Sequence, residues 1–155
     1  MENVLLTIFD VFNFGWVVFL WWFTMKNYND LPQRMPIHFD LNGKADRYGH
    51  KIYAFLMPFL CIIMYALFLL ITKHPEDSNF PVELTEQNKE AQFLIMKIVL
   101  RVLFMLIMIV FLNTQDYMFR YSFDENVKPR ISMMLTILTI IGFVPLILII
   151  THIFK

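Results

Sequence analysis

The chain has 155 residues, a length that suits one domain, and its formal net charge is zero. Hydrophobic residues make up 58% of it and charged residues 17%, whereas a soluble chain usually has about 45–50% and about 25%. A neutral chain without a basic face argues against a nucleic-acid-binding protein, and the single cysteine, Cys61, excludes an intrachain disulfide. The composition indicates a protein whose main solvent is lipid.

Apolar residues gather in four runs of roughly membrane-spanning length. They cover residues 4–24, 52–71, 91–112 and 131–154. The first run has no preceding basic residue, so we expect a retained helix and not a cleaved signal peptide. The third run contains Lys97 and Arg101, and we expect it to carry both cations into the membrane. The sequence therefore predicts an all-α integral membrane protein with four transmembrane helices in one domain, residues 1–155.

The distribution of basic residues predicts an orientation. Four spans place both termini on one side of the membrane. The loops after the first and third runs carry eight Lys and Arg residues, whereas the other side carries three. Because cytoplasmic loops are enriched in Lys and Arg, we expect loops one and three in the cytoplasm.

The polar stretch between the first two runs, residues 28–53, has the strongest local signals. Pro32 and Pro36 disfavour a continuous helix, so residues 35–40 are predicted to be extended. Asn42-Gly43 is a tight-turn signal because both residues tolerate positive φ. We expect this loop to fold as an irregular cap over one mouth of the bundle.

Four residues of this loop carry groups that bind metals: His38, Asp40, Asp46 and His50. On an extended segment His38 and Asp40 point to one face, and Asp46 and His50 share a face if their segment is helical. Imidazole and carboxylate are common metal ligands, although the spacing matches no strong zinc motif. Two other interpretations stay open: general acid–base use of His38, or a compact loop in which His38 and Asp40 bond backbone amides and Asp46 caps a turn.

Polar residues also lie inside the first and third runs. Asp10 and Asn13 are three residues apart, and Lys97 and Arg101 are four apart, so each pair forms a stripe on one helix face. A lone charge inside a membrane is costly, so we expect Asp10 to pair with Lys97 or Arg101. Alternatively, Lys97 extends to the headgroups and Arg101 faces a water-filled dent. A wet stripe would suit a ligand cavity or a proton relay.

The loop also resembles a known family. Leu31-Pro32, Met35–Phe39, Gly43, Asp46, Gly49 and Lys51 are similar to the pattern LP..IP.HFN..G..D..G.K, with Asp40 where the family usually has Asn. That pattern is typical of a bacterial membrane domain of unknown function at the N-terminus of SdpI-like immunity proteins. Residues 79–88, NFPVELTEQN, resemble the family's NYPV..TEEN segment. The resemblance implies a multi-pass protein of the bacterial cytoplasmic (inner) membrane, with an immunity or signalling role.

These observations favour a binding or sensing membrane protein of unknown ligand. The expected recognition residues are those of the motif loop: Pro32, Pro36, His38, Phe39, Asp40, Gly43, Asp46 and Lys51. Its expected surroundings are the lipid bilayer, with a toxic peptide or a regulator protein as partner. The alternatives are a metal-dependent membrane-embedded enzyme using the loop His and Asp residues, and a small transporter subunit using the Asp10, Asn13, Lys97 and Arg101 stripe.

Overall fold

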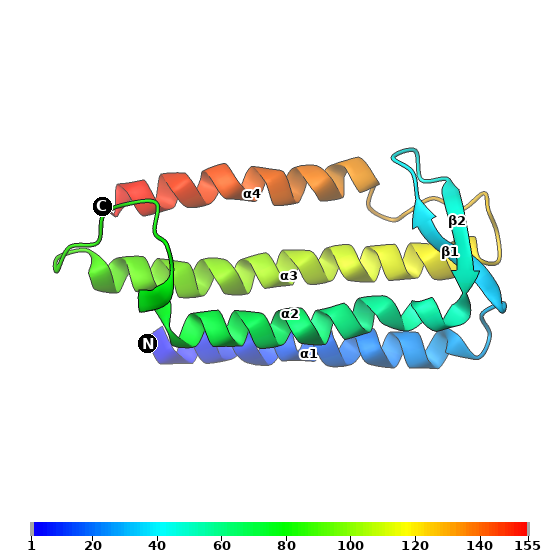
Figure 1. Cartoon of the computed structure of the whole chain (residues 1–155), viewed down its shortest axis with the longest axis horizontal. Coiled ribbons are helices and arrows are strands. Elements are labelled where there is room, and N and C mark those ends of the chain that lie inside the picture. Colours follow the sequence, from blue (N-terminus) through cyan, green and yellow to red (C-terminus); the bar gives the residue numbers. More distant parts are fainter. Residues whose placement is uncertain (1, 155) are drawn as a thin grey trace.

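Long helices lying side by side form the body of the protein, and a small sheet covers one end (Figure 1). The computed structural model describes residues 2–154, apart from the side chains of Glu2, Asn3 and Met133. Its elements are α1 (Glu2–Tyr28), β1 (Arg34–Phe39), β2 (Ala45–His50), η1 (Lys51–Phe55), α2 (Leu56–Lys73), η2 (Pro75–Asp77), α3 (Lys89–Tyr121) and α4 (Met133–Ile153). The start of α1 and the end of α4 lie at the same end of the bundle (Figure 1).

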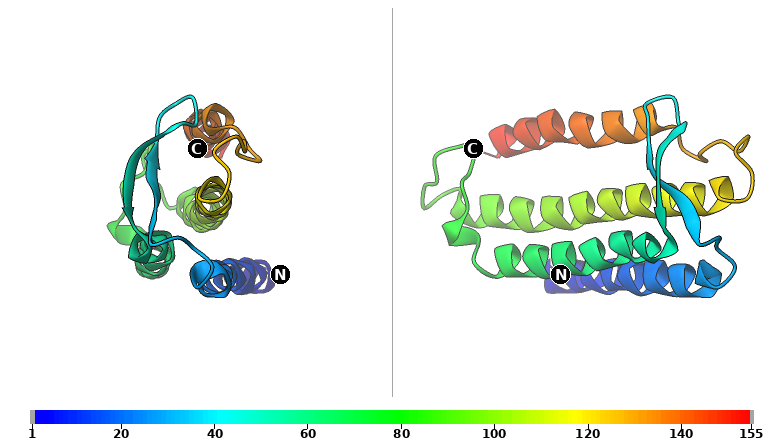
Figure 2. Two further views of the ribbon diagram at one scale, coloured as in Figure 1. Left: turned by 90° about the vertical axis from the view of Figure 1, so that its right-hand side faces the viewer. Right: turned by 45° about the vertical axis from the view of Figure 1, so that its right-hand side comes forward.

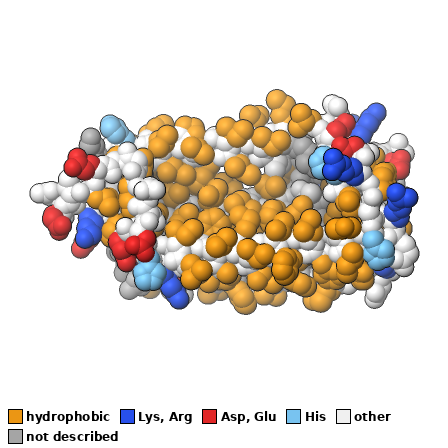
Figure 3. Space-filling model, in the orientation of Figure 1, with side chains coloured by type: hydrophobic (Ala, Val, Ile, Leu, Met, Phe, Trp, Pro, Cys, Tyr) orange, Lys and Arg blue, Asp and Glu red, His pale blue; other side chains and the backbone are white. Residues whose placement is uncertain are grey.

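The surface of the bundle is that of a membrane protein. All of α1 to α4 are long and apolar enough to cross a bilayer. Apolar side chains cover the length of the helices, and charged side chains gather at the two ends (Figure 3). In lipid, exposed residues such as Val11 and Leu138 need no cover, because lipid tails are as apolar as the side chains. The expected all-α integral membrane fold is confirmed.

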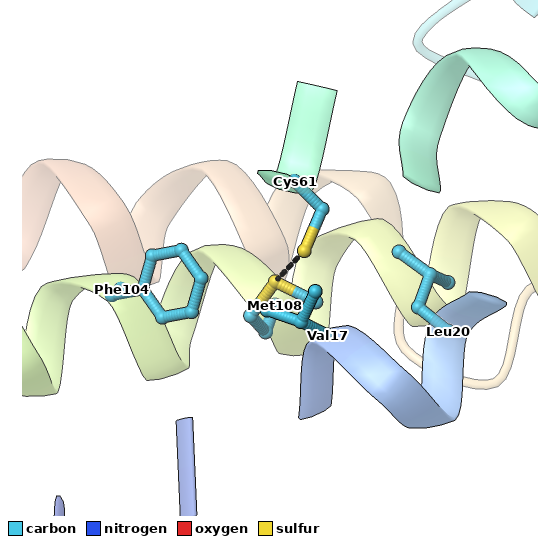
Figure 4. Packing of buried hydrophobic residues seen from close by; sticks show 5 residues of the cluster. All are labelled: Val17, Leu20, Cys61, Phe104 and Met108. Carbon is cyan, nitrogen blue, oxygen red and sulfur yellow. Dashed lines mark hydrogen bonds between the residues drawn. The ribbon is translucent and has the colours of Figure 1, made fainter. Parts of the chain in front are cut away.

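Three helices supply the best-packed core. Val17 and Leu20 of α1, Cys61 of α2, and Phe104 and Met108 of α3 meet in the middle of the bundle (Figure 4). The Cys61 thiol donates a hydrogen bond to the Met108 sulfur at 3.2 Å, as a small buried hydrophobe with a weak donor. Helix α4 packs on α3 and stands apart from the α1–α2 pair (Figure 2). One flank of the bundle is therefore more open than the other.

Helix α3 is longer than the sequence predicted, because it ends at Tyr121 and not near residue 112. At the helical rise its 33 residues reach about 50 Å, well beyond a hydrocarbon core of about 30 Å. Polar residues that suggested a loop find hydrogen-bond partners within the helix bundle. The Gln115 amide donates to Thr24 Oγ1 at 3.1 Å and to the Ala54 carbonyl at 2.7 Å. The end of α3 thus becomes the support for the cap.

The cap is more regular than the irregular loop expected from the sequence. Strands β1 and β2 form an antiparallel hairpin in which Arg34 is paired with His50 and Phe39 with Ala45. The tight turn predicted at Asn42-Gly43 is confirmed, with Gly43 at φ 79°. β1 tolerates Pro36 because both strands of a two-stranded sheet are edges.

Candidate functional site

The hairpin is fastened to the protruding end of α3. The Tyr117 hydroxyl donates a hydrogen bond to the Gly43 carbonyl at the turn, and the Tyr121 hydroxyl accepts one from the Ala45 amide at 3.4 Å. The Phe39 ring packs between these tyrosines, with centroids 4.7 Å from Tyr117 and 5.2 Å from Tyr121. The turn and the strand ends are therefore held in place by one face of one helix.

The base of the hairpin is anchored in a second apolar cluster. Leu31, Met35, Ala54, Met118 and Phe119 are buried together there. The Lys51 ammonium donates to the carbonyls of Tyr28 and Leu31, at 3.3 and 3.4 Å, and so closes the entry to the hairpin. The ends of α1 and η1 are thereby joined.

The predicted recognition residues divide into two groups. Pro36 and Gly43 are buried, Pro32, Phe39, Asp40 and Lys51 are half-buried, and His38 and Asp46 are exposed. The buried and half-buried members shape and fasten the hairpin. His38 and Asp46 remain available at the surface.

The four metal-ligand candidates are not gathered into one site. His38 Nδ1 lies 2.5 Å from Asp46 Oδ1 across the two strands. The Asp40 carboxylate instead accepts the backbone amides of Asn42 and Lys44, at 2.9 and 2.8 Å, and His50 Nδ1 accepts the Ile52 amide at 3.2 Å. Within residues 2–154 no three His, Cys, Asp or Glu side chains are placed to share a metal ion.

The compact-loop interpretation agrees with the structure at Asp40 but not at His38 and Asp46. Asp40 bonds backbone amides, as that interpretation predicted, and the amide of Lys44 is the main reason that the pKa of its carboxyl is lowered. His38 and Asp46 differ from it, because they contact each other and not the backbone. The pairing depends on the register of the hairpin, which the sequence did not reveal.

A cleft of about 670 Å³ opens between the tip of the hairpin and the link from α3 to α4. Its lining mixes apolar and charged side chains, among them Leu41, Lys44, Tyr121, Glu125, Lys128 and Met134. Leu41 is 82% exposed at the rim. The Tyr48 hydroxyl donates to Glu125 Oε1 at 3.1 Å and joins the hairpin to the link. This contribution of the link was not predicted from the sequence, in which its polar composition was the only signal.

The second candidate site is the polar stripe inside the bundle. Arg101 binds Asp10 through two parallel hydrogen bonds, from Nε at 2.8 Å and from Nη2 at 2.9 Å. Arg101 also donates from Nη1 to the Lys97 carbonyl at 3.0 Å, and the Asn13 amide donates to the Arg101 carbonyl at 3.1 Å. The expected pairing of α1 with α3 is confirmed, with Arg101 as the cation. Lys97 makes no ion pair within the described chain.

The stripe is closed in this conformation. The space beside Asp10, Asn13 and Tyr65 has a volume of about 10 Å³. That volume admits about one water molecule. Asn13 Oδ1 is buried without a partner among the described residues, and it is the natural contact for such a water. Because the space is so small, the polar stripe is a contact that joins α1 to α3 and not an open cavity.

Two further polar contacts were not foreseen. At the end of the bundle away from the hairpin, the Gln92 amide donates to the carbonyls of Thr151 and Phe154, at 3.0 and 2.9 Å. Near the hairpin, Asp116 accepts hydrogen bonds from Arg120 and Arg130. Both contacts hold α4 or its preceding link to α3. Asp116 lies beyond residue 112, where the helix was predicted to end, whereas Gln92 lies inside the predicted helix and only its partner carbonyls were not foreseen.

Together, the four apolar helices and the docked hairpin define a multi-pass α-helical membrane protein with a small folded cap. Residues 16–62 match the family described as Domain of unknown function (DUF1648). This segment contains the second half of α1, the whole hairpin and the start of α2. The match therefore falls on the unit that forms the cap.

One similar protein is an uncharacterized protein of Archaeoglobus fulgidus. It is 30% identical over 73 residues, which cover 42% of this chain and 40% of the archaeal protein. The similarity thus spans less than half of that relative. No solved structure gives a significant match.

Proposed function

We propose that this is a binding or sensing membrane protein whose recognition surface is the cleft between the hairpin and the α3–α4 link. The observation that carries the proposal is the contrast within the hairpin. Its base and turn are pinned by Tyr117, Tyr121 and Lys51, yet Leu41 at its tip is 82% exposed over an open cleft. A rigid scaffold that presents exposed loop residues is the usual arrangement of binding sites.

Helix α3 supplies the route from this surface into the membrane. Tyr117, which holds the hairpin, and Arg101, which holds Asp10, lie about 24 Å apart along one continuous helix. A ligand that prefers one position of the hairpin would shift the population of α3 positions relative to α1. In this proposal, the Asp10–Arg101 pair is the contact that resists the shift.

The lining of the cleft suggests a protein or peptide ligand of mixed character. Leu41, Val127 and Met134 offer apolar contacts. Lys44 and Lys128 offer positive charges, and Glu125 offers a negative one. With the hairpin in the cytoplasm, as the basic residues favour, the partner would be a cytoplasmic regulator protein. A secreted toxic peptide would require the opposite orientation.

Photocrosslinking in cells tests the proposal. A photoreactive amino acid replaces Leu41 at the cleft, and a matched probe replaces Leu70, which is 59% exposed on α2. We expect the probe at Leu41 to form a crosslinked product with a discrete peptide or protein, and the probe at Leu70 to form none. Equal products at both positions, or none at Leu41, would contradict the proposal.

A second candidate function, immunity to a secreted toxic peptide, is favoured by the match of residues 16–62 together with the SdpI-like motif of the loop. Its test is survival of a toxin-sensitive bacterium that expresses the chain, compared with a chain whose residues 34–50 are replaced by a flexible linker. The metal-enzyme alternative is less well supported because its ligands are divided among three separate contacts. The transporter alternative is less well supported because the stripe is closed by a two-point ion pair.

A further inference from the structure

An apolar cavity lies on the open flank of the bundle and has no part in the proposed function. It has a volume of about 260 Å³ and is lined by Trp16, Phe19 and Phe23 of α1, Leu112 and Asp116 of α3, and Arg130 of the α3–α4 link. It continues along α1 into a shallower groove of about 580 Å³ that shares Trp16, Phe19 and Leu112 and reaches Val11 and Gly15. The cavity and the shallower groove share these lining residues, and together they are called the α1–α3 groove.

The dimensions of the α1–α3 groove suit one lipid tail. From Val11 to Phe23 it follows about 18 Å of helix α1, and one leaflet of hydrocarbon is about 15 Å thick. Helix α4 packs on α3 and stands apart from α1 (Figure 2). Exposed Val11 and Phe12 on this wall place the groove in contact with the surrounding bilayer.

The mouth of the groove carries a positive charge. The carboxylate of Asp116 is shared by two guanidinium groups, Arg120 Nε at 2.9 Å and Arg130 Nε at 3.0 Å, so the cluster keeps one net positive charge. The Arg130 side chain is 71% exposed, and its two terminal amino groups form no hydrogen bond or ion pair within residues 2–154.

The carboxylates of the adjoining link are engaged elsewhere. Asp124 accepts hydrogen bonds from the backbone and side-chain amides of Asn126, and Glu125 accepts one from Tyr48. Of the two charged residues that line the cavity, Asp116 and Arg130, only Arg130 is exposed.

We propose that the α1–α3 groove is a binding site for one anionic phospholipid. One acyl chain lies along Trp16, Phe19 and Leu112, and the phosphate accepts hydrogen bonds from the terminal amino groups of Arg130. The apolar walls account for the tail, and the charge at the mouth accounts for the preference for a negative headgroup.

A glycine in the groove allows a direct test of the acyl-chain contact. A Cβ added at Gly15 would meet no atom within 4 Å, so Gly15→Leu starts a larger side chain in open space at a residue that lines the groove. The matched control is Gly142→Leu on α4, which also opens onto empty space and does not line the groove. Native mass spectrometry of the full chain in mild detergent, with added phosphatidylglycerol, measures the bound lipid. We expect Gly15→Leu to lose most of it and Gly142→Leu to keep it.

A charge variant tests the headgroup contact. Arg130→Gln should bind phosphatidylglycerol about fivefold more weakly, because one surface cation adds a modest attraction for anionic lipid. The matched control is Arg47→Gln, an exposed strand residue with no ion pair in the described part of the chain. Phosphatidylcholine, whose headgroup has no net charge, should lose less affinity than phosphatidylglycerol in Arg130→Gln.

The outcomes separate this proposal from its competitors. Lipid binding that is unchanged in Gly15→Leu, or reduced equally in Gly142→Leu, would overturn it, and so would an Arg130→Gln variant that keeps its preference for phosphatidylglycerol. Val11 is 68% exposed in the same groove, so Val11→Cys reports on a different occupant. Disulfide crosslinking between two Val11→Cys chains would show that a second copy covers the groove, and this also overturns the proposal.

Discussion

Asp10 and Arg101 form an ion pair inside the membrane-spanning part of the bundle, where either charge alone would be costly. Asp10→Asn leaves the Arg101 guanidinium without its counter-ion, so we expect a loss of about 3–5 kcal/mol in stability, the usual cost of breaking a buried pair. Thermal unfolding in detergent measures it. The exchanged pair Asp10→Arg with Arg101→Asp should recover part of the loss.

The control for this prediction is Asp30→Asn. Asp30 is exposed after the end of α1 and makes no ion pair among the described residues, so its replacement should change the unfolding temperature little. If Asp10→Asn unfolds at the same temperature as Asp30→Asn, the pair does not stabilise the bundle.

Gly43 combines two requirements in one residue. Its φ of 79° is unfavourable for other residues, and a Cβ there would lie 3.3 Å from the Tyr117 hydroxyl oxygen. Gly43→Ala should therefore destabilise the hairpin by about 1–3 kcal/mol through backbone strain. Faster hydrogen exchange at residues 45–50 would report the loss. Gly142→Ala, which adds a methyl group in open space, should not change exchange there.

At the residue scale, the sequence predicted contacts that depend on depth or on local turns. Asp10 needed a cation from the third helix, but Lys97 and Arg101 are one turn apart on long side chains, so the sequence left both open as its partner. The amide contacts of Asp40 were predictable because Asp commonly bonds the backbone in turns. The pairing of His38 with Asp46 was not predictable, since it depends on the register of β1 against β2.

At the scale of elements, the hairpin and the end of α3 form one structural unit. Tyr117→Phe removes the donor to the buried Gly43 carbonyl, and an unsatisfied buried acceptor costs about 1–3 kcal/mol. We expect the hairpin amides to exchange faster while those in the middle of α3 stay protected. Tyr48→Phe is the matched control, because its bond to Glu125 is exposed and should be worth much less. Equal effects of the two variants would show that Tyr117 does not fasten the hairpin.

The turn of the hairpin should also respond to acid. Bonds from the amides of Lys44 and Asn42 lower the pKa of Asp40, so the charged carboxylate stabilises the turn above its ordinary pKa of about 3.9. This contribution is lost as the pH falls through the lowered pKa. Amide chemical shifts of residues 42 and 44 should change only in that acidic range. Asp40→Asn should keep the turn and abolish the transition, and a wild-type midpoint above the ordinary value would contradict the assignment.

The elements themselves were only partly predictable. Apolar runs located α1, α2 and α4 because lipid imposes length and composition on any spanning helix. The predicted end of α3 was wrong because Asn113, Gln115 and Asp116 are polar and suggested a loop, although each has a hydrogen-bond partner outside the helix. Strand β2 was missed because Asp46 and Gly49 have low strand preference, and pairing with β1 overrides it.

At the scale of the whole molecule, the two ends of the bundle differ in construction. The end with the hairpin carries the folded cap, the cleft and the mouth of the α1–α3 groove, all arranged around the last turns of α3. The opposite end holds the start of α1, the end of α4 and the segment that contains η2 (Figure 1). The side of the membrane on which the cap lies therefore decides whether the partner of the cap is a cytoplasmic or an external molecule.

Cysteine labelling can determine this orientation. The native thiol, Cys61, is fully buried between α2 and α3, so the unmodified chain should give no labelling and serves as the blank. Leu41→Cys marks the cap, and Asn79→Cys marks the opposite end, where Asn79 is exposed. With the basic loops in the cytoplasm, a membrane-impermeant maleimide should label Asn79→Cys in intact cells and Leu41→Cys only after lysis. The reverse pattern would place the cap outside, replace the cytoplasmic regulator with an external ligand as the partner, and so favour the immunity function.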